Sequence, residues 1–148
     1  FCSKDEVRFY SFIQELPRRE VIAMWRKDRK QPQVVSVNYP TLKSNKYYEV
    51  AKKYLPNGGC GVVSFELKGG REVASKFMKS LKLIAIETHV ADARSCCLNP
   101  ATSTHRQMTD EQLKEAGVPA GLIRLSCGIE DKDDLINDVK QALDAATK

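Results

Sequence analysis

The stretch LIRLSCGIEDKDDL, residues 122–135, predicts a strand that runs directly into a helix. Apolar residues alternate with polar or small ones, so we expect an apolar face formed by Ile123, Leu125, Cys127 and Ile129. Asp131 stands where the helix N-cap is expected, with Asp134 three positions on as in a capping box. The pattern therefore places a single guanidinium, that of Arg124, on the non-core face of a strand.

Similar patterns predict three further strands and the helices between them. The other strands are expected at 34–40, 62–67 and about 94–98. The helices are expected at 45–55, 71–80, 109–116 and 131–146, the first with Tyr47, Val50, Ala51 and Tyr54 on one side. The irregular segment 82–108 is of a length that is more often functional than not in a compact domain. This order allows either parallel or antiparallel neighbours.

The first 33 residues are predicted to form two helices, roughly 4–16 and 18–30, outside the sheet core. They contribute to a basic excess, because residues 1–60 carry 12 Lys and Arg against 6 Asp and Glu. Basic side chains around Trp25 could contact nucleic acid. A solvated helix face with Trp25 packed inward is the favoured interpretation, since no nucleic-acid-binding motif accompanies them.

Length and composition indicate one globular domain. The chain has 148 residues, of which 42% are hydrophobic and 29% charged. No apolar run approaches the ~20 residues of a membrane helix, and the charged start does not resemble a signal peptide. Because the first residue is Phe1 and not Met, we expect a chain that was processed or belongs to a longer one.

The cysteines predict reduced, buried thiols in the cytoplasm. Their number is odd and they form no C-x-x-C pair: Cys2, Cys60, Cys96, Cys97 and Cys127. The only histidines are His89 and His105, and no metal-ligand spacing is present. We therefore expect no metal site.

Two long stretches resemble one family. They are VNYPTLKSNKYYEVAKKYLPNGGCGVVSFELKGG, from Val37, and HVADARSCCLNPATSTHRQMTDEQLKEAGVPAGLIRLSCGIEDKDDL, from His89. Both resemble the carboxy-terminal domain of the pyridoxal-phosphate (PLP)-dependent enzymes of cysteine and methionine metabolism, most of all the O-acetylhomoserine sulfhydrylases. The resemblance runs from about Val34 to Ala146, and residues 1–33 match only loosely the helix that links the two domains of the family.

The resemblance implies a fold. We expect an α+β domain over residues 34–148, as in fold-type I PLP enzymes: a small, mostly antiparallel four-stranded sheet with helices on one face. The other face would be turned toward the PLP-binding domain, which is absent from this chain together with its Schiff-base lysine. Lys76, in the sequence ASKF, is no substitute because it is expected on a surface helix. This chain alone is therefore expected to be inactive.

The resemblance also implies the site residues. Arg124, in the R-L-S-x-G-I-E motif, would grip the α-carboxylate of an amino-acid substrate, for which a planar, permanently charged fork is suited. Ser95 falls in the loop that supplies a backbone contact to the same carboxylate. No catalytic, cofactor-binding or metal-binding residue is expected here. Asn99 replaces a histidine that is common in the family, and His105 is expected to be a structural loop residue and not an acid or base.

Several functions stay open at this level. The leading hypothesis is an O-acetylhomoserine sulfhydrylase of methionine and cysteine biosynthesis, which replaces acetate by sulfide and is a cytoplasmic homo-oligomer, expected to be a tetramer. Methionine γ-lyase and cystathionine γ-synthase or γ-lyase are the enzymatic alternatives. A free-standing domain that binds amino acids or partner subunits is the non-enzymatic one.

Overall fold

The computed structural model describes residues 33–56 and 59–147, and the two helices expected within residues 1–32 lie outside this part of the chain. The strands are β1 (Val34–Asn38), β2 (Val62–Leu67), β3 (Ala85–Ile86), β4 (Cys96–Leu98) and β5 (Leu122–Ser126). The helices are α2 (Tyr48–Tyr54), α3 (Gly70–Ser80), the 3-10 turn η1 (Pro100–Thr102), α4 (Asp110–Glu115) and α5 (Lys132–Ala146). No helix among these residues is long and apolar enough to cross a membrane.

The strands form one mostly antiparallel sheet in the order β1-β2-β5-β4-β3. The α+β class is confirmed, but the sheet has five strands where four were expected. The additional strand, β3, is parallel to β4 and is held by main-chain bonds from Ala85 N–H to the Ser95 carbonyl and from Glu87 N–H to the Cys97 carbonyl. A two-residue strand made by backbone pairing has no side-chain alternation to reveal it.

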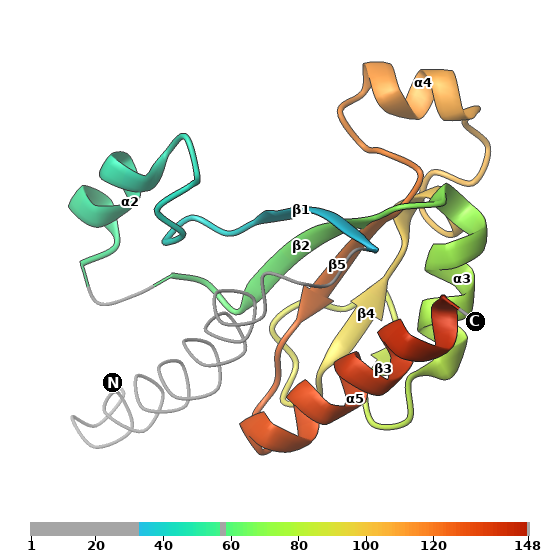
Figure 1. Ribbon diagram of the computed structural model, residues 1–148. Helices are drawn as coiled ribbons and strands as arrows, with labels where there is room; N and C mark the ends of the chain where they lie inside the picture. The colour runs from blue at the N-terminus through green and yellow to red at the C-terminus, as the bar shows by residue number, and fades with distance from the viewer. Residues whose placement is uncertain (1–32, 57–58, 148) are drawn as a thin grey trace.

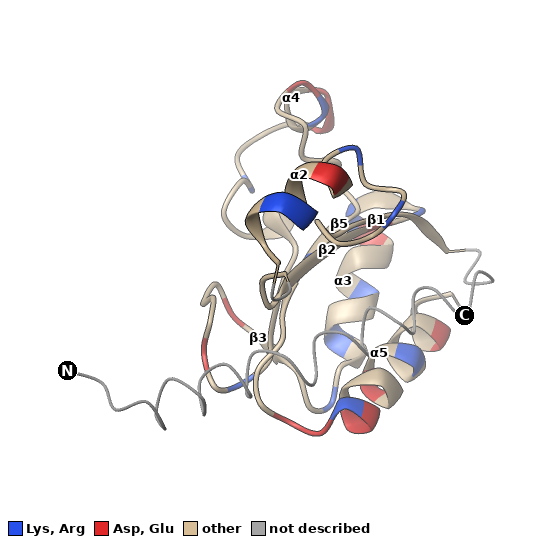
Figure 2. Ribbon diagram, turned by 90° about the vertical axis from the view of Figure 1, so that its left-hand side faces the viewer, with Lys and Arg blue, Asp and Glu red and all other residues tan. Residues whose placement is uncertain are grey.

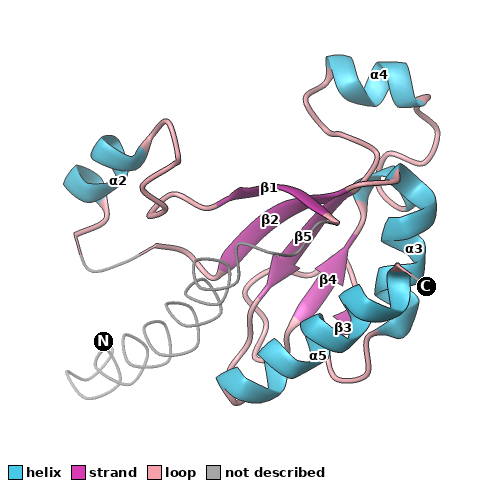
Figure 3. Ribbon diagram, viewed as in Figure 1, coloured by secondary structure: helices cyan, strands magenta, loops and turns pink. Residues whose placement is uncertain are grey.

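Helices α3 and α5 pack together over one face of the sheet (Figure 1; Figure 3). Their apolar stripes meet the inward residues of β2 and β5, and Phe65 contacts Phe77 edge to face at 5.7 Å between ring centroids. The most buried side chains of this core include Val63, Phe65, Leu67, Phe77, Ile123, Leu135, Val139 and Leu143. The hydrophobic core therefore lies between the sheet and these two helices.

The apolar face of β5 is shorter than its sequence suggests. Ile123, Leu125 and Cys127 are buried as expected, but Ile129 is 56% exposed. The strand ends at Ser126, so the alternation of side chains between two faces no longer holds at residue 129. The expected helix cap is present, since the Asp131 carboxylate accepts the main-chain N–H groups of Asp133 and Asp134.

Helix α2 lies apart from the sheet, beyond the end of β1 (Figure 1). Only Ala51 of its expected face is buried, whereas Tyr47, Val50 and Tyr54 are more than half exposed. Their helical spacing is real, but within the described residues it presents an apolar surface to solvent. Figure 2 shows that acidic and basic residues occur together along both α2 and α5.

The predicted burial of the thiols is confirmed only in part. Cys96, Cys97 and Cys127 are buried thiols outside any disulfide, while Cys60 is a thiol that is exposed, contrary to the prediction that the thiols are buried. Cys60 lies just before β2, where the chain turns at the surface. Cys2 lies outside the described residues.

Candidate functional site

Arg124 occupies the middle of β5, which is the central strand of the sheet. Because side chains alternate along a strand and its neighbours Ile123 and Leu125 enter the core, Arg124 points to the face away from α3 and α5. The residues beside it are Ser64 on β2 and Leu98 on β4. Neither carries a charge, and Glu66, the next residue of β2 on this face, forms no ion pair with Arg124 and instead accepts a hydrogen bond from Ser36.

Main-chain carbonyls hold one amino group of this guanidinium. Its Nη2 donates to the carbonyl oxygen of Thr88 at 2.7 Å and to that of His89 at 3.4 Å. Within residues 33–56 and 59–147, Nε and Nη1 make no hydrogen bond, and Arg124 forms no ion pair. The group therefore keeps donors for a carboxylate, which accepts hydrogen bonds through both oxygens.

The carbonyls come from the 88–95 loop, which joins β3 to β4 and is attached to the chain that follows Arg124. The Ala91 N–H donates to Ser126 Oγ at 3.1 Å, and the Ile129 N–H donates to the Ala93 carbonyl at 2.9 Å. Residues 88–94 of this loop are exposed. Its position is thus set by polar contacts with residues 126–130 more than by burial.

Ser95 ends this loop and is completely buried. Its N–H and its hydroxyl donate to the two carboxylate oxygens of Glu130, each at 2.7 Å, and its Oγ accepts the Gly128 N–H at 2.8 Å. Its carbonyl accepts the Ala85 N–H at 3.0 Å. Every polar group of Ser95 is thus engaged inside the domain, and a contact between Ser95 and a ligand stays a prediction.

Gly128 allows the loop to lie close against the end of β5. A Cβ atom at this position would be 2.3 Å from the Ala93 carbonyl oxygen and 2.6 Å from the Ser95 nitrogen. Both contacts are with backbone, which cannot rotate away as a flexible side chain could. Only glycine fits here without moving the loop.

Sequence reasoning missed Glu130, Thr88 and His89 as parts of this site. Glu130 could have been noticed, because it closes the R-L-S-x-G-I-E motif that begins at Arg124. Thr88 and His89 contribute carbonyl oxygens, which every residue possesses, so no residue type marks their role.

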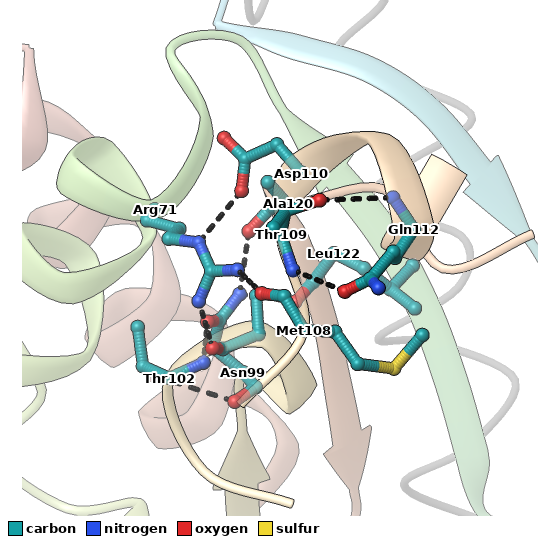
Figure 4. Close-up of polar contacts among 10 residues, drawn as sticks. Arg71, Asn99, Thr102, Met108, Thr109, Asp110, Gln112, Ala120 and Leu122 are labelled. Atoms are coloured by element: carbon teal, nitrogen blue, oxygen red, sulfur yellow. Dashed lines mark hydrogen bonds and ion pairs between the residues drawn. The ribbon is translucent and has the colours of Figure 1, made fainter. Parts of the chain in front are cut away.

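Asn99 joins the end of β4 to the start of β5 (Figure 4). Its Nδ2 donates to the carbonyls of Ala120 and Leu122 at 3.0 and 2.8 Å, and its Oδ1 accepts the Thr102 N–H at 2.9 Å. The side chain is fully buried and caps η1. Asn99 therefore fixes the strand that carries Arg124, two residues beyond Leu122.

His105 lies in the turn after η1. Its N–H donates to the Pro100 carbonyl at 2.8 Å, and its Nδ1 is 2.8 Å from Thr104 Oγ1. These contacts are local: the side-chain partner is the hydroxyl of Thr104, and no carboxylate contacts the imidazole among the described residues. A structural role for His105 in this turn stays a prediction.

Lys76 does not fit the lysine that would form a Schiff base with PLP. Lys76 lies on the exposed side of α3, and its Nζ is 3.2 Å from Glu72 of the same helix. An ammonium in water with a helical partner is not the desolvated amine that a Schiff base requires. Nor does the described part of the chain hold a group of His, Cys, Asp or Glu residues able to bind a metal.

These observations define a class of protein. It is a small α+β domain whose central strand carries an arginine that points away from the core. The sequence model of the family described as Cys/Met metabolism PLP-dependent enzyme matches residues 19–144. The chain belongs to this family.

Comparison with individual proteins shows several activities among its relatives. The chain is 43% identical over 116 residues to an O-acetyl-L-homoserine sulfhydrylase of Leptospira meyeri, covering 78% of this chain and 26% of the relative. It is 42% identical over 117 residues to an L-methionine gamma-lyase of Pseudomonas putida, covering 79% and 29%. The chain thus spans little more than a quarter of the length of these curated relatives.

Two solved structures of PLP-dependent enzymes are also similar to this chain. The crystal structure of yeast cystathionine gamma-lyase has a TM-score of 0.81 and 39% identity, covering 90% of this chain and 34% of that one. A second structure, from Campylobacter jejuni, has a TM-score of 0.76 and 36% identity, covering 86% and 30%, and contains a pyridoxyl-lysine. The fold is therefore shared with domains of PLP-dependent enzymes.

Proposed function

We propose that residues 34–148 form the domain that binds the substrate α-carboxylate in a longer PLP-dependent enzyme. One observation carries this proposal: Arg124 projects from the central strand with one amino group held by carbonyls and no acidic partner within the described residues. Burying part of an arginine without a counterion is costly, and an anionic ligand offsets that cost. In this role Arg124 orients the amino acid and takes no part in bond breaking.

Within the family, we propose the O-acetylhomoserine sulfhydrylase reaction, in which sulfide replaces the acetate of the amino-acid substrate. The extended resemblance and the sulfhydrylase relative support this choice. PLP would be held by a part of the enzyme that this chain does not cover, and the complete protein would be a cytoplasmic homo-oligomer, in our proposal a tetramer.

A lyase is the second candidate, and a specific observation favours keeping it. The methionine gamma-lyase relative is nearly as similar to this chain as the sulfhydrylase relative. A carboxylate-binding arginine serves either reaction, because all these substrates are α-amino acids. Assays of the longer enzyme with O-acetylhomoserine plus sulfide, with methionine and with cystathionine would separate the candidates by product.

We expect Arg124→Lys in the longer enzyme to lower kcat/KM for its amino-acid substrate by about ten- to a hundredfold. Lysine keeps the charge but loses the fork, and a hydrogen bond to a charged group is worth about 1.5–3 kcal/mol. The melting temperature should be nearly unchanged, because the side chain points away from the core. Steady-state kinetics and thermal melting provide the two measurements.

Arg106→Lys is the matched control, since Arg106 is exposed in the turn after η1 and contacts Ser103 only through its backbone. Arg106→Lys should leave both kcat/KM and the melting temperature unchanged. An Arg124→Lys enzyme with the efficiency of the wild type, or one whose melting temperature collapses, would show that Arg124 is structural.

A further inference from the structure

We propose that Glu130 is a positioning residue for substrate binding, acting on Arg124 through the 88–95 loop. This inference rests on the proposed function of Arg124 and adds to it the part of the domain that holds the guanidinium in place. The chain of contacts runs from Glu130 to Ser95, along the loop to Thr88 and His89, and from their carbonyls to Arg124.

The first step is the attachment of the loop to Glu130. Both carboxylate oxygens are used, one by the Ser95 N–H and the other by the Ser95 hydroxyl, each at 2.7 Å. Hydrogen bonds to an ionised acceptor are shorter and stronger than neutral ones. Two of them at one residue fix both the position and the orientation of the Ser95 backbone.

The second step is the shape of the loop between Ser95 and His89. Ala91 has φ of 62°, the only positive φ of a non-glycine residue in the described part of the chain. This left-handed conformation is unfavourable for alanine and persists only where surrounding contacts impose it. Here the contacts are the Ala91 N–H bond to Ser126 and the Ala93 carbonyl bond from Ile129, with Ser95 anchored beyond them.

The third step is the effect on Arg124. The loop residues 88–94 are exposed, so if the anchor at Ser95 were lost, only the main-chain bonds of Glu87, Ala91 and Ala93 would keep the Thr88 and His89 carbonyls in place. An arginine side chain that no longer contacts these acceptors samples more rotamers. Restricting it again when the substrate binds costs conformational entropy, which lowers the affinity for the substrate. Glu130 thereby determines how well the guanidinium is preorganised.

The experiment measures discrimination in favour of an α-carboxylate. In the longer enzyme, inhibition constants are determined for an amino-acid inhibitor and for the amine that lacks its carboxylate, with wild type and the variants Glu130→Ala, Glu130→Gln and Arg124→Lys. The ratio of the two constants reports on the carboxylate contact and not on general stability. Melting temperatures are recorded in parallel.

Asp138→Asn is the matched control. Asp138, like Glu130, is a carboxylate that accepts main-chain N–H groups, but it is buried on α5, on the core side of the sheet, and has no contact with the loop. It should lower the melting temperature and leave the ratio unchanged.

We expect Glu130→Ala to reduce the discrimination ratio about tenfold and Glu130→Gln to reduce it less, because an amide oxygen still accepts one of the two bonds from Ser95. If Glu130→Ala does not fold, the ratio measured for Glu130→Gln decides whether the inference holds. A wild-type ratio in the folded Glu130 variants, with a reduced ratio in Arg124→Lys, would overturn this inference alone. A wild-type ratio in Arg124→Lys would instead overturn the proposed function.

Discussion

Asp138 shows how one residue can join distant parts of the chain. Its carboxylate accepts the N–H groups of Lys82, Leu83 and Ile84 at 2.8–2.9 Å and so connects α5 to the segment that leads into β3. Burial alone would raise the pKa of Asp138, but these bonds and one from Gln141 outweigh it and hold the pKa below its ordinary value. The ionised form is therefore the one that stabilises the fold.

The pH dependence of stability follows from this shift. A carboxyl group with a lowered pKa in the folded state contributes stability above its unfolded pKa of about 3.9 and loses that contribution as the pH falls through the folded value. We expect the unfolding free energy to drop in this acid range, and Asp138→Asn to remove this drop while lowering stability at neutral pH by about 2–3 kcal/mol. Denaturant titrations at a series of pH values measure both effects.

Asp144→Asn is the control, on the exposed side of the same helix. If both variants showed the same acid profile, the stabilising role assigned to Asp138 would be wrong.

The thiols should differ sharply in reactivity. Burial, and secondarily the neighbouring Cys96, raises the pKa of Cys97 to about 12, and Arg124 lowers it only in part. With this pKa only about one Cys97 thiol in ten thousand is ionised at pH 8, and the thiolate is the reactive form. We expect iodoacetamide to modify exposed Cys60 long before Cys97, as measured by peptide mass spectrometry over time. Equal labelling rates in the folded protein would contradict this.

At the scale of elements, Arg71 is the main connection between α3 and the segment that contains α4 (Figure 4). Its Nε donates to Asp110 at 2.7 Å, its Nη2 to the Met108 carbonyl at 2.6 Å, and its Nη1 to the Ala101 carbonyl. Asp110 is 61% exposed, so the ion pair itself contributes little. The two carbonyl contacts are the stronger reason for the position of this segment.

We therefore expect Arg71→Lys to destabilise the domain by about 1.5–3 kcal/mol, since lysine can keep the ion pair but cannot reach both carbonyls in the same geometry. Amide exchange in residues 108–116 should accelerate more than in β5. Hydrogen-exchange mass spectrometry and thermal melting test these two effects.

Lys76→Gln is the control, because its pair with Glu72 is exposed and lies within one helix. It should cost no more than about 0.5 kcal/mol. Exchange in residues 108–116 that is unchanged by Arg71→Lys would show that other contacts position α4.

At the scale of the whole molecule, the features that could be predicted from the sequence are those whose pattern lies within a single strand or helix. The alternation around Arg124 placed it correctly off the core, and the helix expected at 109–116 is present as α4, with a capping box formed by Thr109 and Gln112. Such signals are local, because one strand or one helical turn contains all the residues that produce them. The class of fold followed from these patterns together with the resemblance.

The features that could not be predicted from the sequence depend on contacts between segments that are far apart in the chain. Neither the short β3 nor the Thr88 and His89 carbonyls that hold Arg124 have a side-chain signature. The exposure of Ile129 follows from where β5 stops, which is set by the end of its pairing with β2 and β4 at Ser126. The side-chain roles of Glu130 and Asn99 are likewise set by partners more than 20 residues away in the chain.

The sheet order has a consequence for how the protein is made. The central strand β5 is the last of the five in the chain, and it alone joins the β1–β2 pair to the β4–β3 pair. During synthesis on the ribosome, each pair must wait with an open edge until residues 122–126 emerge, and α5, which covers the core, follows later still. Pairing between segments far apart in sequence is slow, and unpaired edges invite association with other chains. We therefore expect the unpaired strand edges of the nascent domain to stay open to other chains until its final quarter has been translated.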